Sequence, residues 1–221
     1  MESEPARVWV IDLDAAEHGG GEFPADVRWL DTRERARAEA LRDPTESRRY
    51  LAAHSALRIL LSQATWTTPG DLRFLHERCT ACGGDHGRPY LLGGPHFSLS
   101  RSGRWAAVAL SHEQPVGVDL EARQAASTLE PLRDDLLAPG ERSDDLLRTW
   151  VRKEALVKAS GEGLNRSLAT VPPDAGPVHD LELPPGLVGA IAGVTEFTLE
   201  TQASTKVRQP MPARSFPESA E

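Results

Sequence analysis

Two short stretches of the sequence carry carboxylates at spacings that favour metal or acid–base chemistry. Asp119 and Glu121 are two residues apart, so on a strand their side chains face the same side. Glu154 and Lys158 are four residues apart and share a face on a helix, with Lys153 at the edge of that face. If the helix packs against the strand end, three carboxylates meet. Because they repel one another, such a cluster needs a cation, and oxygen ligands favour Mg²⁺.

Each motif alone also has an ordinary interpretation. A carboxylate pair at a strand end is usually solvated, and a Glu–Lys pair at this spacing stabilises an exposed helix by only about 0.3 kcal/mol. The lysines are nevertheless conspicuous, because the chain contains three lysines against 22 arginines. Two of the three, Lys153 and Lys158, lie five residues apart, with Glu154 between them.

Length and composition limit the classes of protein to consider. A chain of 221 residues with 39% hydrophobic and 26% charged residues predicts a globular protein of one domain or two compact lobes. The net charge of −8 disfavours bulk attraction to nucleic acid. The first residues lack a signal-peptide pattern, and the apolar run at residues 187–194 is too short to span a bilayer. We therefore expect a cytoplasmic protein without a membrane segment.

The two cysteines form a Cys-x-x-Cys pair in the segment CTACGGDHG. Cys79 and Cys82 are compatible with a redox couple or with half of a zinc site, to which His76 or His86 would add ligands. A second cysteine pair is missing, and no βαβ pattern supports a redox role. A loop with two thiols that hold no metal is the favoured interpretation, and structural zinc is the alternative.

Hydrophobic periodicity predicts the elements that would position these residues. The predicted helices cover residues 24–41, 45–63 and 143–161. The predicted strands cover residues 7–13, 71–77, 97–99 and 105–110, a segment ending at 121, and residues 187–194 and 196–200. An order of helix and then strands recurs in both halves, which indicates two similar lobes. Residues 202–221, rich in Ser and Pro, are expected to be disordered.

Three segments together resemble the 4′-phosphopantetheinyl transferases, specifically the two-lobed Sfp type. The family pattern Gly-x-Asp-x-Glu reads GVDLE at residues 117–121. The pattern Trp-x-x-Lys-Glu-Ala-x-x-Lys-x-x-Gly-x-Gly-Leu reads WVRKEALVKASGEGL at residues 150–164, with every fixed position matched. An upstream family segment corresponds to GRPYLLGGPHFSLSRSG at residues 87–103. The resemblance extends over about residues 33–192, and the second motif is highly specific.

The resemblance implies an α+β fold of two similar lobes related by a pseudo-two-fold axis, each an antiparallel sheet packed against a long helix. The N-terminal lobe would comprise residues 1–114 and the C-terminal lobe residues 115–201, with coenzyme A and Mg²⁺ between them. In this family the 4′-phosphopantetheine arm of coenzyme A moves to a serine of an apo carrier protein, and 3′,5′-ADP is released. The doubled length implies a monomer, because single-lobe relatives must oligomerise to build the same cleft.

The same resemblance assigns roles to the residues of the C-terminal lobe. Asp119, Glu121 and Glu154 would hold Mg²⁺ against the pyrophosphate of coenzyme A. Glu154, or a water that it orients, would remove the proton from the attacking serine. Lys158 would meet the pyrophosphate as a compact cation, and Lys153 would lie near it.

The nucleotide side of coenzyme A would fall to the N-terminal lobe. Arg88 stands where the family has Lys, and Ser100 and Arg101 occupy the Ser-His positions, so that arginine replaces the family histidine. Arginine also binds phosphate, even with two hydrogen bonds at once. Arg37 and Arg49 align loosely with basic positions that contact phosphate.

Two other functions remain open from the sequence. A Mg²⁺-dependent phosphohydrolase would use the same carboxylates but would not need the whole pattern at residues 150–164. A binding protein that holds coenzyme A or a carrier protein without turnover belongs to a different class. In that case, Arg101 in place of histidine would indicate that activity has been lost.

Overall fold

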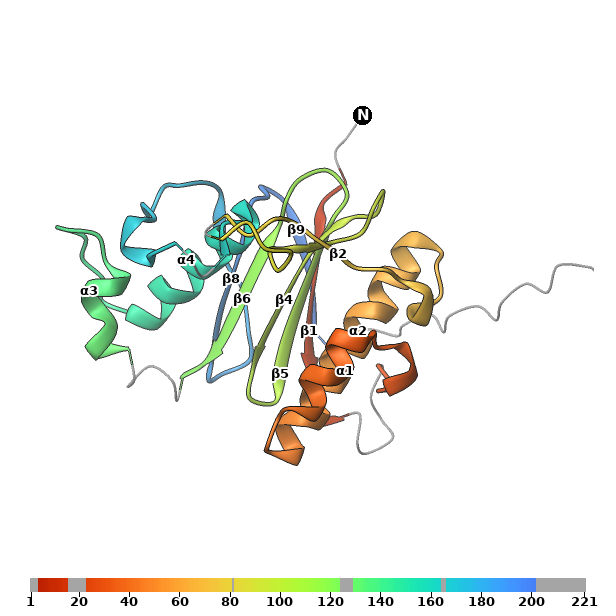
Figure 1. Cartoon of the computed structure of the whole chain (residues 1–221). Coiled ribbons are helices and arrows are strands. Elements are labelled where there is room, and N and C mark those ends of the chain that lie inside the picture. Colours follow the sequence, from red (N-terminus) through yellow and green to blue (C-terminus); the bar gives the residue numbers. More distant parts are fainter. Residues whose placement is uncertain (1–3, 16–22, 81, 124–128, 164–165, 202–221) are drawn as a thin grey trace, which may run out of the picture.

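The computed structural model describes residues 4–15, 23–80, 82–123, 129–163 and 166–201 (Figure 1). The predicted disorder at residues 202–221 lies outside these ranges. The described helices are α1 (Thr32–Glu39), α2 (Pro44–Thr65), α3 (Arg133–Leu136) and α4 (Leu146–Ser160), with short 3₁₀ turns at η2 (Val27–Trp29), η3 (Pro69–Asp71), η5 (Glu130–Leu132) and η7 (Leu168–Thr170). The described strands are β1 (Ala6–Asp12), β2 (Leu75–His76), β3 (Pro89–Tyr90), β4 (His96–Ser102), β5 (Trp105–Ser111), β6 (Gly117–Ala122), β7 (Val178–Asp180), β8 (Leu187–Ala192) and β9 (Phe197–Thr201).

Two sheets lie between two long helices (Figure 1). One sheet has the strand order β4-β5-β1-β9, and the other has the order β6-β8-β7. Helix α2 covers the outer face of the first sheet, and α4 covers the outer face of the second. A separate two-stranded ribbon pairs β2 with β3. This arrangement is a mixed α/β structure, compatible with an α+β fold.

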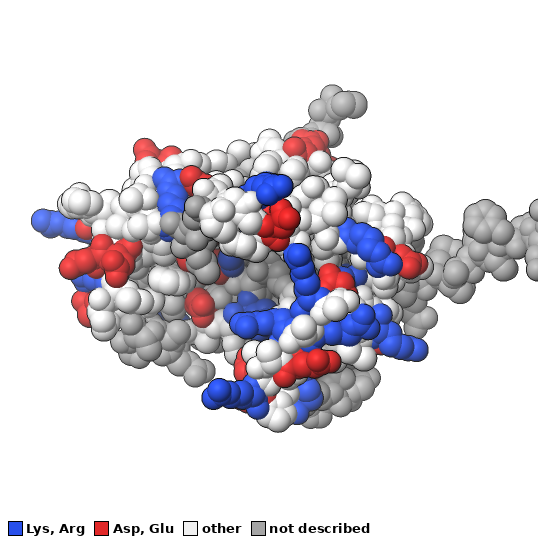
Figure 2. All heavy atoms as spheres, viewed as in Figure 1, with Lys and Arg blue, Asp and Glu red and all other residues white. Residues whose placement is uncertain are grey.

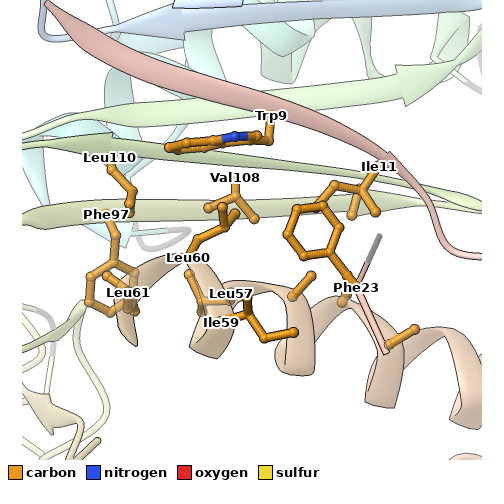
Figure 3. Close-up of a cluster of buried hydrophobic side chains, with 14 of the residues drawn as sticks. Trp9, Ile11, Phe23, Leu57, Ile59, Leu60, Leu61, Phe97, Val108 and Leu110 are labelled. Carbon is orange, nitrogen blue, oxygen red and sulfur yellow. The ribbon is translucent and has the colours of Figure 1, made fainter. Parts of the chain in front are cut away.

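The cluster beneath α2 comes from alternating positions of the strands. Trp9 and Ile11 of β1 and Val108 of β5 point towards α2, which supplies Leu57 and Leu60 among others (Figure 3). Side chains two apart on a strand share a face, so the residues between them must face the other way. Val8 of β1 and Ala107 of β5 do so, and they belong to the second cluster.

The second cluster fills the space between the two sheets. Val8 and Ala107 from the first sheet pack there with Val118, Leu120 and Ile191 from the second. A third cluster joins the outer face of β8 to α4. Because Val118 and Leu120 point into the core, the alternating Asp119 and Glu121 side chains point to the opposite face of β6, where α4 lies.

Strands β4 and β6 are joined by serine side chains. The backbone N–H groups of Val118 and Ala122 donate to the hydroxyls of Ser98 and Ser102, at 3.0 and 3.1 Å. The Leu120 N–H donates to the Ser100 hydroxyl between them, at 3.3 Å. The two sheets therefore meet along one edge, which brings the end of β6 beside β4.

A buried ion pair fixes α1 against α2. Arg58 of α2 is 0% exposed, and its Nη2 donates to Glu34 Oε2 of α1 at 2.6 Å. Its Nη1 donates to the carbonyls of Pro69 and Leu72 at 2.9 and 3.2 Å. A single guanidinium thus ties two helices and a connecting segment together.

Several predicted elements are confirmed and others are shorter than predicted. The second helix is present as α2, whereas the predicted helix at 24–41 is reduced to α1 and the turn η2. Helix α1 begins where it does because Asp31 and Glu34 form a reciprocal capping box. Helix α4 begins after Asp145, whose side chain accepts from the Arg148 N–H at 3.1 Å, rather than at 143. The strand predicted at 71–77 is reduced to β2.

The course of the chain near its C-terminal end adds a feature that the sequence did not predict. Strand β9 pairs in parallel with β1, so the sheet of β4, β5 and β1, which is otherwise antiparallel, is mixed. Residues 197–201 therefore belong to the sheet of the N-terminal half. The division at residue 114 stays a prediction. Among the described helices, none has both the length and the apolar character that crossing a membrane requires.

Candidate active site

A close approach between β6 and α4 builds the site. A Cβ atom at Gly117 would lie 2.0 Å from the carbonyl oxygen of Ala155 and 2.5 Å from the backbone nitrogen of Ala159. Such contacts are impossible, so only glycine allows this approach. Gly117 thereby lets the following residues, Asp119 and Glu121, lie next to α4.

A pocket of about 460 Å³ opens where β4, β6, α2 and α4 meet. Its polar lining consists of Ser100, Arg101, Asp119, Glu121, Glu154, Lys158 and His54. Of the ten site residues that the sequence predicts, this pocket brings six together. The three carboxylates of the predicted metal site are among them.

Asp119 is the most tightly engaged of the three carboxylates. It is 4% exposed, and its Oδ1 accepts from the Ser100 hydroxyl at 2.7 Å and from Lys158 Nζ at 2.6 Å. Its Oδ2 is buried and has no hydrogen-bond partner among the described residues. A buried carboxylate oxygen without a partner is costly, and it is the kind of atom that a bound cation satisfies.

Glu154 and Glu121 lie in unfavourable surroundings for negative charge. Burial raises the pKa of Glu154 to about 7, and the nearby Asp119 and Glu121 carboxylates add to the effect, while Lys158 opposes it. Burial also raises the pKa of Glu121, with a further increase from Asp119, although its Oε2 accepts from the Ser102 hydroxyl at 2.5 Å. The cluster therefore holds more negative charge than Lys158 neutralises.

The chemistry of these donors fits a hard divalent cation. All three side chains offer oxygen, which Mg²⁺ prefers, and one buried oxygen is without a partner. Their oxygens do not all lie within 4.8 Å of one another, and Lys158 lies among them. Asp119 disfavours the charge of both Glu121 and Glu154, so a cation would stabilise the group.

Lys153 lies elsewhere, although it is five residues from Lys158. It is 2% exposed, and its Nζ donates to Glu141 Oε2 at 2.6 Å and to the carbonyls of Leu136 and Leu168 at 2.8 and 3.2 Å. These contacts attach α3, the segment that follows it and η7 to α4. The structure does not bring Lys153 to the pocket.

Arginines gather at the α2 side of the pocket. The guanidinium of Arg101 lies 5.2 Å above the ring of Tyr50, and its Nη1 is 3.9 Å from Glu46 Oε2. Burial lowers the pKa of Arg101, and the positive charges of Arg37 and Arg49 lower it further. In Figure 2, basic side chains line the right-hand rim of the central hollow, over α1 and α2. Such a group of cations suits an anionic ligand.

Arg37 is exposed on α1, outside the lining of the acidic pocket, and three other predicted residues already have partners within the chain. Arg49 donates to both carboxylate oxygens of Asp14, at 2.8 and 2.7 Å, and to Glu46. The Ser100 hydroxyl links β4 to β6, because it donates to Asp119 and accepts from the Leu120 N–H. Arg88 donates to the Ala159 carbonyl at 2.9 Å and to Glu77 at 2.6 Å, and it lines an adjoining pocket of about 520 Å³.

Two residues of the site were not predicted from the sequence. His54 lines both pockets, and its Nδ1 is 2.9 Å from Glu34 Oε1. Tyr50, four residues earlier on α2, stacks on the His54 ring at 4.0 Å and supports Arg101. The spacing of four was a usable signal, because it puts both rings on one face of the helix.

Curated proteins similar to this chain share one name. The putative 4′-phosphopantetheinyl transferase slr0495 of Synechocystis is 31% identical over 167 residues, which cover 69% of this chain and 65% of the relative. The 4′-phosphopantetheinyl transferase HetI of Nostoc is 29% identical, covering 73% of this chain and 71% of the relative. The chain thus spans less than two-thirds of the Synechocystis protein. No family model matches the chain.

A third relative has a higher identity, and the chain matches a larger share of it than of the Synechocystis protein. The 4′-phosphopantetheinyl transferase AcpT of Salmonella typhimurium is 34% identical over 138 residues, which cover 56% of this chain and 71% of the relative. Together with the acidic pocket between β6 and α4, this similarity leads to one conclusion: the chain belongs to the 4′-phosphopantetheinyl transferase family.

Proposed function

We propose that this protein transfers the 4′-phosphopantetheine arm of coenzyme A to a serine of an apo carrier protein domain and releases 3′,5′-ADP. The observation that carries the proposal is the acidic pocket, in which Asp119 Oδ2 is buried without a partner and Lys158 lies beside the carboxylates. Named relatives are 4′-phosphopantetheinyl transferases. The carrier domain and coenzyme A are therefore the proposed partners.

We assign Mg²⁺ to Asp119, Glu121 and Glu154, whose oxygens and excess negative charge fit it. When bound, the ion would neutralise charge on the pyrophosphate of coenzyme A. The serine oxygen forms a bond to the phosphorus that carries pantetheine, and the bond from that phosphorus to the bridging oxygen breaks. The electron pair of that bond leaves with 3′,5′-ADP.

The residues of the chain have distinct parts in this reaction. Glu154, directly or through a water, accepts the proton of the attacking serine. Lys158 lies within hydrogen-bond distance of Asp119 and presents its ammonium to the same pocket, where it stabilises charge on the leaving phosphate. Arg101, with Arg37 and Arg49 near it, binds a phosphate on the nucleotide side of coenzyme A.

We further propose the Sfp type, a cytoplasmic monomer whose two lobes are related by a pseudo-two-fold axis. Two long helices, each covering the outer face of its own sheet, support this architecture. The acidic pocket has walls from α2 and β4 as well as from β6 and α4. One chain therefore supplies both sides of the pocket, as a monomeric enzyme would need.

Intact-mass measurement tests the proposed function. The protein is incubated with coenzyme A, Mg²⁺ and a panel of apo carrier domains, with carriers in which the acceptor serine is alanine as controls. We expect a gain of one phosphopantetheine on at least one serine carrier, none on the alanine controls, and loss of the reaction with excess chelator. Coenzyme A binding without any mass gain would instead indicate a binding protein, and full transfer in chelator would exclude the metal assignment.

A further inference from the structure

We propose that Cys79, Cys82 and His86 bind a zinc ion that fixes the loop between β2 and β3. One ligand atom from each of the three lies within 4.8 Å of the others, and the Cys82 Sγ is 2.9 Å from His86 Nε2. The sequence favoured thiols without a metal and left open which histidine would join them. The geometry identifies His86 and reverses that preference.

The three ligand atoms, all within 4.8 Å of one another, lie close enough for zinc to bind after a small shift. In tetrahedral zinc with the usual bond lengths, two sulfurs are about 3.8 Å apart, and a sulfur and a nitrogen are about 3.6 Å apart. The Cys82–His86 distance of 2.9 Å is that of a hydrogen bond to sulfur, so zinc requires these two side chains to separate by about 0.7 Å. Both side chains are exposed, which makes such a shift easy, while Cys79 is buried and holds its position.

The backbone of the loop is shaped to bring the three side chains together. The Cys79 N–H donates to the Gly84 carbonyl at 2.8 Å, and the Gly83 N–H donates back to the Cys79 carbonyl at 2.8 Å. A Cβ at Gly84 would lie 3.0 Å from the His86 ring and 3.3 Å from Cys82 Sγ. Any larger residue at Gly84 would crowd the ligands, so this glycine leaves space where the ion would be held.

The donor set selects the metal. Two thiolates and one imidazole are ligands for a borderline-soft ion, and they suit zinc much better than Mg²⁺. Three protein ligands leave a fourth tetrahedral position, which we assign to water. The site is separate in chemistry from the acidic pocket, because no carboxylate belongs to it.

The loop has contacts that explain why fixing it matters. The Thr80 hydroxyl donates to the Glu162 carbonyl at 3.3 Å, just beyond the end of α4, and Arg88 donates to the Ala159 carbonyl at 2.9 Å. Figure 1 shows the loop after β2 extending to the end of α4. Zinc would thus rigidify one wall of the adjoining pocket, which Cys79, His86 and Arg88 line with Lys158.

Elemental analysis of untagged protein, purified without chelators, tests the site. We expect about one zinc per chain in the wild type and less than about a tenth of that in Cys82→Ser and His86→Asn. His112→Asn, which changes an exposed histidine outside the cluster, serves as the matched control and should keep the zinc. Zinc retained in both ligand variants would overturn the assignment.

Cobalt substitution of the wild type gives a second measurement that does not depend on how the variants fold. Cobalt in this site should show thiolate charge-transfer absorption and the intense visible bands of a tetrahedral complex, both displaced by one equivalent of zinc. Wild-type protein that holds no zinc after dialysis against it, and shows no thiolate–cobalt band, would exclude the site. A Cys79–Cys82 disulfide in metal-free protein from reducing cells would exclude it equally. None of these readouts requires transferase activity.

Discussion

Two buried carboxylates, Glu34 and Glu154, differ in their surroundings: the chain stabilises the charge of Glu34 and disfavours the charge of Glu154. Glu34 accepts hydrogen bonds from Arg58, from the Asp31 N–H and, at its other oxygen, faces His54. Burial by itself raises the pKa of Glu34, but these partners more than offset it and bring the pKa to about 2. Glu154 has no hydrogen-bond partner among the described residues, and its pKa is raised to about 7.

The difference separates a structural charge from a functional one. Both side chains are almost completely buried, at 7% and 5% exposure, so the desolvation of their charges is similar. At Glu34 the chain supplies the compensating cation itself. At Glu154 it supplies two more carboxylates and one lysine, so the remaining compensation comes from a proton or from a bound ligand.

The same substitution at both positions should give opposite results. Glu34→Gln removes the carboxylate nearest to the buried Arg58 and leaves it only the longer contact to Asp31, at 3.6 Å, so we expect the free energy of unfolding to fall by about 3 kcal/mol. Glu154→Gln removes a charge that burial and its neighbours disfavour, so unfolding should cost the same or about 1 kcal/mol more. Denaturant titration at pH 8 in metal-free buffer measures both. A similar loss of stability in the two variants would contradict the distinction.

Acid should remove the stability that Glu34 provides. The pKa of Glu34 is lower in the folded than in the unfolded protein. Its contribution to the free energy of unfolding is therefore complete above the ordinary pKa of 4.5 and disappears as the pH falls to about 2. The loss over this interval should be about 3 kcal/mol. Glu34→Gln is the control, because it lacks this carboxyl. If wild type and Glu34→Gln lose stability in parallel below pH 4.5, the pKa of Glu34 is not what stabilises the fold.

Lys158 and Lys153 offer a test of the same distinction on one helix. Lys158→Arg keeps the charge, but a planar guanidinium fits poorly beside Asp119, so we expect kcat to fall by roughly a hundredfold while folding is kept. Lys153→Met should instead lower stability, because the partly buried Glu141 and two carbonyls lose their donor. Steady-state transfer and denaturant titration measure the two effects, with Arg148→Lys on the exposed face as control. Wild-type turnover in Lys158→Arg would show that any cation suffices.

How far the sequence predicts the site depends on whether the geometry is local. Asp119 with Glu121, and Glu154 with Lys158, were predicted to share faces because strand and helix periodicities are local properties. The two pairs meet because Gly117, in the first motif, allows β6 to approach Ala155 of α4 closely. Only the folded structure reveals this contact.

The wrong predictions concern contacts between segments that lie far apart in the sequence. Lys153 was predicted near the pocket from the family resemblance and from its place at the edge of the helix face, yet its ammonium turns to Glu141 and to carbonyls of α3 and η7. Helix periodicity cannot foresee where those segments lie. The parallel pairing of β9 with β1 was missed for the same reason, since it joins strands nearly 190 residues apart.

The smallest effect concerns Arg101, which replaces the family histidine. Burial disfavours the charge of Arg101; Glu46 and Tyr50 favour it, while Arg37 and Arg49 oppose it, so the chain supplies only part of the compensation and leaves room for more. If a phosphate of coenzyme A supplies that compensation, Arg101→Ala should raise the KM for coenzyme A by about tenfold. A donor without the 3′-phosphate should be affected less, and Arg35→Ala, at an exposed position of α1, should change neither KM. Steady-state kinetics with both donors measures the difference. Equal effects on the two donors would mean that Arg101 does not contact that phosphate, and that its strained environment is a property of the fold alone.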